Sequence, residues 1–98
     1  MLRHILLVKF TEQTSKQDLA KLEQAFDQLK TDITGIETIE FGENNSPEGL
    51  NKGYSHAIVM CFSDLAARDA YLSNPYHEAF KVLFVPMIDD ILVFDYVY

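Results

Sequence analysis

Hydrophobic and polar residues alternate along four short stretches of this chain, and between them apolar residues recur at the spacing of a helix. The alternation predicts strands at Leu2–Phe10, Ile36–Phe41, Tyr54–Phe62 and Ile91–Tyr98. The first and third stretches are apolar on both faces, which is typical of central strands that are covered on both sides. The second stretch is more polar, and we expect it at an edge of the sheet.

The intervening segments carry the signals of helices. Ser15 reads as an N-cap, with Asp18 three residues later as a weak form of the capping box. Apolar residues then recur on one helical face as far as residues 33–35, and they are Leu19, Leu22, Phe26 and Leu29. Two shorter helices follow the third strand. They are separated by a break at Asn74, a good N-cap, and Pro75, which suits the first position of a helix.

The resulting order is strand, helix, strand, strand, two helices, strand. It predicts an α+β fold of the ferredoxin-like, split βαβ type over a single domain, residues 1–98. The four-stranded antiparallel sheet has the order 4-1-3-2, with the helices on one face. Small residues of the third strand are expected beneath the helices, because close helix packing needs them: Ser55, Ala57, Val59 and Cys61. His56 then faces away from the helices.

This arrangement leaves the other face of the sheet bare. That face is predicted to carry His4 and His56 together with a row of apolar residues: Leu6, Val8, Phe10, Ile58, Met60 and Phe62. So much apolar area is not left in water, and a second sheet is the natural cover. The sequence therefore predicts a homodimer in which two sheets pack face to face.

Composition and charge narrow the classes of function. Eight basic and fifteen acidic residues give a net charge of −7 over 98 residues. This balance argues against a nucleic-acid partner, since that affinity comes from lysine and arginine contacts to phosphate. No apolar run is long enough for a membrane span, and no basic amphipathic helix suits a membrane surface. One cysteine, Cys61, allows no intrachain disulfide, and we expect a soluble, cytoplasmic protein.

The long connection at residues 42–53 offers no cofactor motif. It lacks a phosphate-binding lysine pattern and the glycine fingerprint of a dinucleotide site. Its acidic residues are too sparse for a calcium loop. We therefore expect no cofactor and no metal site, although a connection of this length is typical of functional or mobile loops.

The stretch Tyr71–Phe80 carries the main candidate chemistry. The helix break inside it lets Tyr71 and His77 point toward one place, which a straight helix does poorly at a six-residue spacing. A phenol and an imidazole that converge beside apolar residues can act as a general acid–base pair. The alternative is structural, with Tyr71 packed into the core and His77 wet on the surface.

Five segments, spread over nearly the whole chain, form a recognisable pattern: Arg3–Phe10, Asn45–Leu50, Gly53–His56 with the strand that follows, Tyr71–His77 and Ile91–Asp95. In this order and spacing they resemble the stress-responsive dimeric α/β-barrel domains, the Dabb family. The resemblance implies a ferredoxin-like homodimer whose two sheets close into a barrel. The bare sheet face leads independently to the same expectation.

One plant member of that family is a cofactor-free polyketide cyclase that performs an aldol closure. Its three histidines, tyrosine and aspartate match this chain at His4, His56, Tyr71, His77 and Asp95. We assign His77 as the base that takes a proton next to a carbonyl, Tyr71 as the group that orients it or polarises the carbonyl, and His56 as a pocket hydrogen-bond donor. The residues that line the cyclase pocket are not recognisable here, so its substrate does not carry over.

His4 and Asp95 are expected to lie close together, because the first and last strands run antiparallel. There they either bind a ligand or form a buried hydrogen-bonded pair. By the same geometry, His4 and His56 begin two antiparallel strands and are expected toward opposite ends.

Two functions of different class remain open. The first is a cofactor-free enzyme of the lyase or cyclase type that acts on a small apolar or aromatic carbonyl compound. A cofactor-free monooxygenase is a further option, because a fold does not fix a function. The second is a non-catalytic dimer that binds a ligand or has a structural role under stress. A pocket bounded by Tyr71, His77 and His56 favours the first, and packed side chains in that space favour the second.

Overall fold

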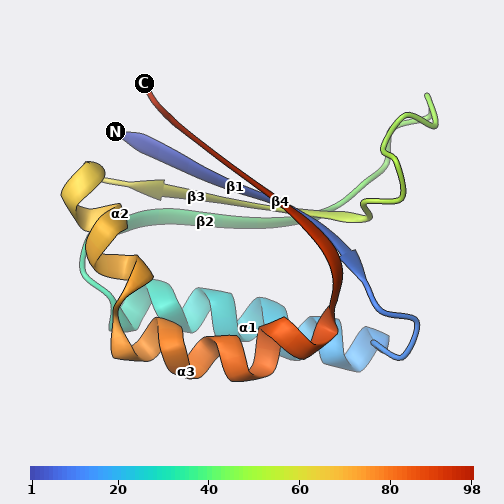
Figure 1. Ribbon diagram of the computed structural model, residues 1–98, viewed down its shortest axis with the longest axis horizontal. Coiled ribbons are helices and arrows are strands. Elements are labelled where there is room, and N and C mark those ends of the chain that lie inside the picture. The colour runs from blue at the N-terminus through green and yellow to red at the C-terminus, as the bar shows by residue number, and fades with distance from the viewer.

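Four strands and three α-helices make up the chain, and the computed structural model describes all 98 residues. In chain order the elements are β1 (Leu2–Phe10), α1 (Lys16–Asp32), β2 (Ile36–Glu43), β3 (His56–Phe62), α2 (Leu65–Leu72), α3 (Pro75–Phe84), the 3₁₀ turn η1 (Val85–Met87) and β4 (Ile88–Val97). The strands form one antiparallel sheet in the order β2-β3-β1-β4 (Figure 1). This confirms the ferredoxin-like, split βαβ fold, with β1 and β3 in the centre and β2 at an edge.

Each helix begins at a side chain that caps its free backbone N–H groups. Ser15 and Asp18 form the predicted capping box, because each side chain accepts a hydrogen bond from the other's backbone N–H at 3.0 Å. Asp64 caps α2 and Asn74 caps α3, each by accepting a backbone N–H two or three residues later. Pro75 occupies the start of α3, where its missing N–H costs nothing. Asn74 and Pro75 therefore determine where α2 and α3 are separated.

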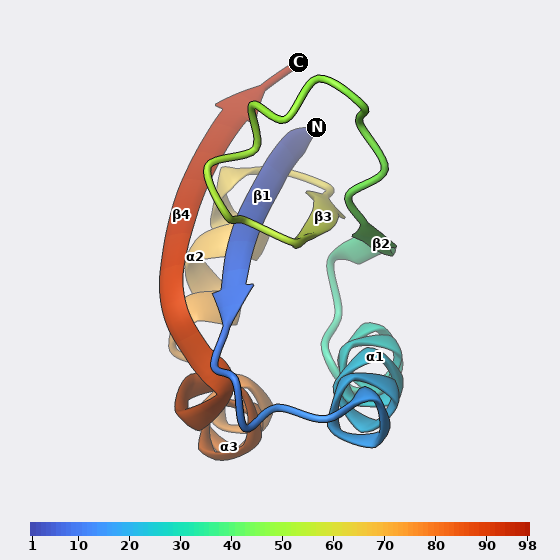
Figure 2. The same ribbon diagram turned by 90° about the vertical axis from the view of Figure 1, so that its right-hand side faces the viewer.

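All the helices lie on the same side of the sheet. α1 and α3 run beneath it, with α3 on the side of β4 and α1 on the side of β2 (Figure 2). Their apolar stripes meet the sheet in one core, whose helical members are Leu22, Phe26, Leu29, Tyr71, Phe80 and Phe84. Burying a leucine or phenylalanine side chain fully stabilises the fold by about 1.5–3 kcal/mol. None of the three helices combines the length and the apolar character that crossing a membrane requires.

The helices cover the opposite face of the sheet from the one predicted. The buried strand residues beneath them are Leu2, His4, Leu6, Val8, Ile58, Met60 and Phe62. The prediction was wrong because both faces of β1 and β3 are apolar, so the amount of apolar surface does not decide between them. The connection from β1 through α1 to the parallel strand β2 decides it, since such connections are right-handed in nearly all folds. The larger side chains then fill the space beneath the helices at high packing density.

This correction also changes the face of the sheet on which two histidines lie. His4 is 6% exposed and lies in the helix-covered core, and His56 also points toward the helix layer rather than away from it. Met60, predicted to lie in a dimer interface, is fully buried inside its own chain. Both histidine side chains of the strands therefore lie on the helix-covered side of the sheet.

The open face of the sheet is apolar along its centre. Alternate residues of β1, β3 and β4 line it: Ile5, Leu7, Ala57, Val59, Leu92 and Phe94. Leu92 is 49% exposed and Phe94 is 65% exposed. A single sheet layer thus leaves an apolar face uncovered, as predicted, but this face carries the other set of strand residues.

Candidate functional site

A mainly apolar cavity of about 230 Å³ lies between the sheet and α3, on the side of β4. Three polar rings reach it, those of His4, Tyr71 and His77. Most of the remaining lining is apolar and includes Leu6, Phe80, Phe84, Ile88, Ile91 and Val93. An apolar cavity with a few convergent polar groups is the usual form of a small-molecule site, although the volume of this cavity lies somewhat below the usual range.

The break between α2 and α3 brings Tyr71 and His77 together. Tyr71 lies in the last turn of α2 and is 2% exposed, whereas His77 lies in the first turn of α3 and is half-buried. Their ring centroids are 4.1 Å apart and the ring planes are tilted by 34°. The predicted convergence of the two side chains is confirmed. They meet ring to ring, however, rather than through a hydrogen bond.

His77 is held in the tautomer that a general base requires. Its Nδ1 lies 3.3 Å from the backbone oxygen of Leu72. A carbonyl oxygen only accepts, so Nδ1 carries the hydrogen and Nε2 of the neutral ring keeps a free lone pair. Burial lowers the pKa of His77 below its ordinary value of 6.5, against a smaller opposing effect of the Leu72 carbonyl. The imidazole is therefore neutral near pH 7 and able to take a proton.

The Tyr71 hydroxyl remains a free hydrogen-bond donor. Burial raises the pKa of Tyr71 well above its ordinary value of 10, so the phenol keeps its proton. The hydroxyl makes no hydrogen bond within the chain, yet no fully buried side-chain N or O atom lacks a partner. It must therefore reach accessible space, where it can donate to a ligand.

Two successive side-chain hydrogen bonds fix the position of the His4 ring. Nδ1 of His4 lies 2.7 Å from Oδ1 of Asp95, as the antiparallel register of β1 and β4 leads one to expect. The other oxygen, Oδ2, accepts a hydrogen bond of 2.8 Å from the Arg68 guanidinium. Since a carboxylate only accepts, Nδ1 of His4 carries the hydrogen and Nε2 is free. Asp95 therefore fixes both the tautomer and the orientation of the ring.

Arg68 was missed in reading the sequence. It lies three residues before Tyr71 on α2, so the two side chains share one helical face. That spacing is the signal that could have identified it. The prediction that Asp95 lies near His4 is confirmed, and Arg68 adds the cation that keeps the aspartate paired.

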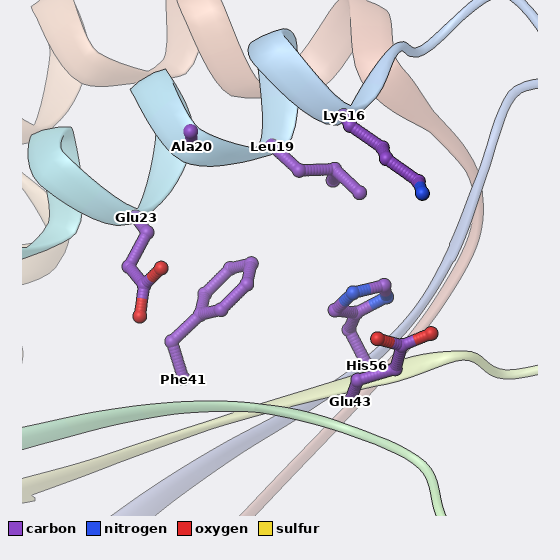
Figure 3. A pocket seen from close by; sticks show the side chains of 7 residues that line it. All are labelled: Lys16, Leu19, Ala20, Glu23, Phe41, Glu43 and His56. Carbon is purple, nitrogen blue, oxygen red and sulfur yellow. The ribbon is translucent and has the colours of Figure 1, made fainter.

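His56 does not join this pocket. In the register of the central strands it pairs with Val8, four residues along β1 from His4. At about 3.4 Å per residue, this places the two histidines roughly 14 Å apart along the strand. His56 instead reaches a second, larger cavity of about 580 Å³ between α1 and the other end of the sheet (Figure 3). A pocket bounded jointly by Tyr71, His77 and His56 is therefore not formed.

The arrangement around Tyr71 and His77 can perform acid–base chemistry without further groups. A neutral imidazole nitrogen can accept a proton, and a phenol can donate a hydrogen bond to an oxygen on which negative charge develops. No cluster of three or more histidine, cysteine, aspartate or glutamate side chains is arranged to hold a metal ion.

Comparison with known proteins identifies the relatives of this chain. The model of the Dabb family, the stress-responsive A/B barrel domain, matches residues 2–98. The stress-response A/B barrel domain-containing protein HS1 of Arabidopsis thaliana is 29% identical over 94 residues, which cover 96% of this chain and 86% of HS1. Olivetolic acid cyclase of Cannabis sativa is 19% identical over 94 residues, which cover 96% of this chain and 93% of the cyclase.

Solved structures share the same fold. A crystal structure of the Arabidopsis thaliana protein At3g17210 has a TM-score of 0.96 at 28% identity. The match covers 100% of this chain and 95% of the At3g17210 chain. Hydroxynitrile lyase from Passiflora edulis has a TM-score of 0.92 at 21% identity, covering 99% and 92%. A protein from Jannaschia, described as a dimeric ferredoxin-like protein of unknown function, has a TM-score of 0.86 at 24% identity, covering 99% and 98%.

Proposed function

This chain belongs to the Dabb family of stress-responsive A/B barrel domains, and from that premise we propose that it is a homodimeric, cofactor-free acid–base enzyme. Its substrate is a small apolar carbonyl compound that binds beside Tyr71 and His77. One observation carries the proposal: the free Nε2 of a neutral His77 and the unpartnered hydroxyl of Tyr71 meet at one mainly apolar cavity. A purely structural pair has no need of two free polar groups there.

In the proposed reaction, Nε2 of His77 takes a proton from the carbon next to the carbonyl group. The negative charge that develops on the carbonyl oxygen is stabilised by a hydrogen bond from the Tyr71 hydroxyl, which stays protonated throughout. The carbanion attacks a second carbonyl group of the same substrate and forms a carbon–carbon bond, and the protonated His77 gives its proton to the alkoxide oxygen that results. The low polarity of the cavity strengthens these interactions relative to water.

His4 completes the polar part of the pocket. Its free Nε2 belongs to a ring that Asp95 and Arg68 hold in place, and the ring lies edge-on to Tyr71 with centroids 6.0 Å apart. We assign His4 the role of binding a hydroxyl or second oxygen of the substrate. Asp95 and Arg68 are positioning residues that act through His4.

Two proteins similar to this chain are named as enzymes, olivetolic acid cyclase and hydroxynitrile lyase. A cyclase and a lyase both suit a pocket that moves protons next to oxygen-bearing carbon. Both similarities are below 25% identity, and they support the reaction class rather than a substrate.

The dimer in this proposal forms through the open face of the sheet. The support is the apolar row that includes Leu7, Leu92 and Phe94, which a monomer leaves in water. Structural neighbours from several bacteria are described as dimeric ferredoxin-like proteins. Since the pocket lies on the helix-covered face, each protomer holds a complete set of Tyr71, His77 and His4.

A second candidate function is a non-catalytic dimer that binds a ligand or has a structural role under stress. The close contact of the tilted Tyr71 and His77 rings favours it, because ring packing at the helix break contributes to stability without any chemistry. The two candidates differ in what happens when Tyr71 loses only its hydroxyl.

Turnover of a panel of small β-keto compounds, followed by mass spectrometry, tests the proposal. Tyr71→Phe keeps the packing and is expected to lower turnover by about 10²-fold, and His77→Ala by about 10²–10⁴-fold, with little change in unfolding temperature. Tyr76→Phe is the matched control, because Tyr76 is exposed on the first turn of α3. Unchanged turnover in Tyr71→Phe and His77→Ala, or no turnover by the wild type, supports the non-catalytic candidate.

A further inference from the structure

The second cavity, at the opposite end of the helix layer, has the features of a separate binding site. It measures about 580 Å³, within the usual range for small-molecule pockets. Side chains of α1 project into it from one side, and the ends of β2 and β3 close it from the other (Figure 3). Neither Tyr71 nor His77 lines it, so the reaction proposed above leaves it unused.

His56 is the most firmly held polar group in this cavity. Its Nδ1 lies 2.8 Å from the Ser55 hydroxyl. Its ring is packed between two aromatic rings, with centroids 5.2 Å from Phe10 and 5.5 Å from Phe41. Nε2 has no partner within the chain, so a fixed imidazole offers one free nitrogen to the cavity. A histidine restrained by two neighbouring rings and at one nitrogen is suited to orient a ligand.

Charges of both signs rim the same cavity without neutralising one another. Lys16 projects from the first turn of α1, Glu43 lies beside His56 at the end of β2, and Glu23 closes the far end (Figure 3). None of these three charged side chains forms an ion pair, although ion pairs occur elsewhere in the chain. Between the two ends, Leu19 and the ring of Phe41 supply an apolar surface.

We propose that this cavity binds a small zwitterion of the amino-acid type that carries an apolar side chain. The ligand's carboxylate lies between Lys16 and Nε2 of His56, and its ammonium group pairs with Glu43. The side chain runs over Phe41 and beneath Leu19. Glu23 at the far end disfavours a side chain that ends in a negative charge. The site and its ligand are independent of the proposed reaction at Tyr71 and His77.

Three probes of matching shape test the charge requirement. L-Leucine carries both charges, 4-methylpentanoate lacks the ammonium group and 3-methylbutylamine lacks the carboxylate. Each is titrated into the wild-type protein while NMR follows the ring resonances of His56. We expect saturable binding of L-leucine in the millimolar range. Either single-charge analogue is expected to bind about fivefold more weakly, because each lacks one charged contact at a partly exposed site.

Two variants on the same helix locate the contact. Lys16→Met is expected to weaken L-leucine binding about fivefold, whereas Lys30→Met, on the last turn of α1, leaves it unchanged. The proposal is overturned if His56 shows no saturable shift, if both analogues bind as well as L-leucine, or if Lys30→Met weakens binding as much as Lys16→Met. Shifts confined to His77 and Tyr71 also contradict it, because they assign the ligand to the other cavity.

Discussion

The two faces of the sheet are built from alternate residues of the same strands, yet they end in different surroundings. In β1, Leu6 is 5% exposed beneath the helices, while its neighbour Leu7 is 37% exposed on the open face. Both histidines of the strands, His4 and His56, are on the covered face, as is Asp95. These three titratable side chains therefore lie on the helix-covered side of the sheet. The open face has apolar area and is suited to assembly.

The largest expected effect follows from placing a charge on the covered face. Met60 is fully buried, so Met60→Lys removes an apolar side chain and leaves a charge without a partner in the core. Such a change costs at least about 4 kcal/mol, which is much of the stability of a typical small domain. We expect the variant to be largely unfolded, as measured by far-ultraviolet circular dichroism and urea denaturation.

The same charge on the open face is expected to break assembly and spare the fold. Leu92→Lys introduces a lysine at a residue that is 49% exposed, where a protomer can solvate it but a dimer interface cannot. Sedimentation velocity at micromolar concentration should show a dimer for the wild type and a monomer with native circular dichroism for the variant. Val82→Lys, on the surface of α3, is the matched control and stays dimeric. A monomeric wild type would remove the interface from the proposal.

One arginine lies on each side of the sheet, and replacing the two arginines is expected to affect turnover differently. Arg68 holds Asp95 behind His4 on the covered face, whereas Arg3 contacts Tyr96 and Tyr98 on the open face. We expect Arg68→Met to lower turnover of a β-keto substrate about tenfold and to change its pH profile, because the carboxylate that orients His4 loses a charged hydrogen bond. Arg3→Met should leave turnover per protomer unchanged. Equal losses in both variants would indicate a general effect on stability.

The smallest expected effect is on stability as a function of pH. Burial lowers the pKa of His77 below 6.5, so the unfolded chain binds a proton there more readily than the folded chain does. The contribution of His77 to stability is therefore greatest above pH 6.5 and declines as the pH falls through 6.5 toward the pKa of the folded state. His77→Gln removes this decline, and the difference between its unfolding curve and that of the wild type isolates it from all other groups. Parallel curves for the two proteins would contradict the burial of His77.

The fold could be predicted from the sequence because its signals are local. Capping at Ser15 and Asn74, the alternation along the strands and the order of elements fix the split βαβ topology. The choice of covered face was wrong because alternation shows that β1 and β3 have two apolar faces but does not rank them. That choice depends on the handedness of the connection through α1, a property of the whole fold.

The candidate site could be predicted in part for the same reason. Tyr71 and His77 flank a helix break, and His4 and Asp95 face one another across an antiparallel pair, so short-range rules bring each pair together. The separation of His56 from His4 was predicted from the antiparallel course of β1 and β3 and is confirmed, whereas its size depends on the register of the two strands, which no local pattern specified. The same register explains why His56 lines one cavity whereas His4 and His77 line the other.

The register of β1 has a consequence for how the chain acquires its structure. β1 pairs with β3 on one side and with β4 on the other, and the last of these pairs joins Leu2 to Val97. Contacts between residues so distant in sequence slow folding, because a long loop must close before they form. During synthesis on the ribosome, β1 remains without its complete β4 neighbour until Val97 has emerged. Until then, one edge of β1 has unpaired backbone N–H and C=O groups, and β1 is therefore the strand whose pairing is completed last.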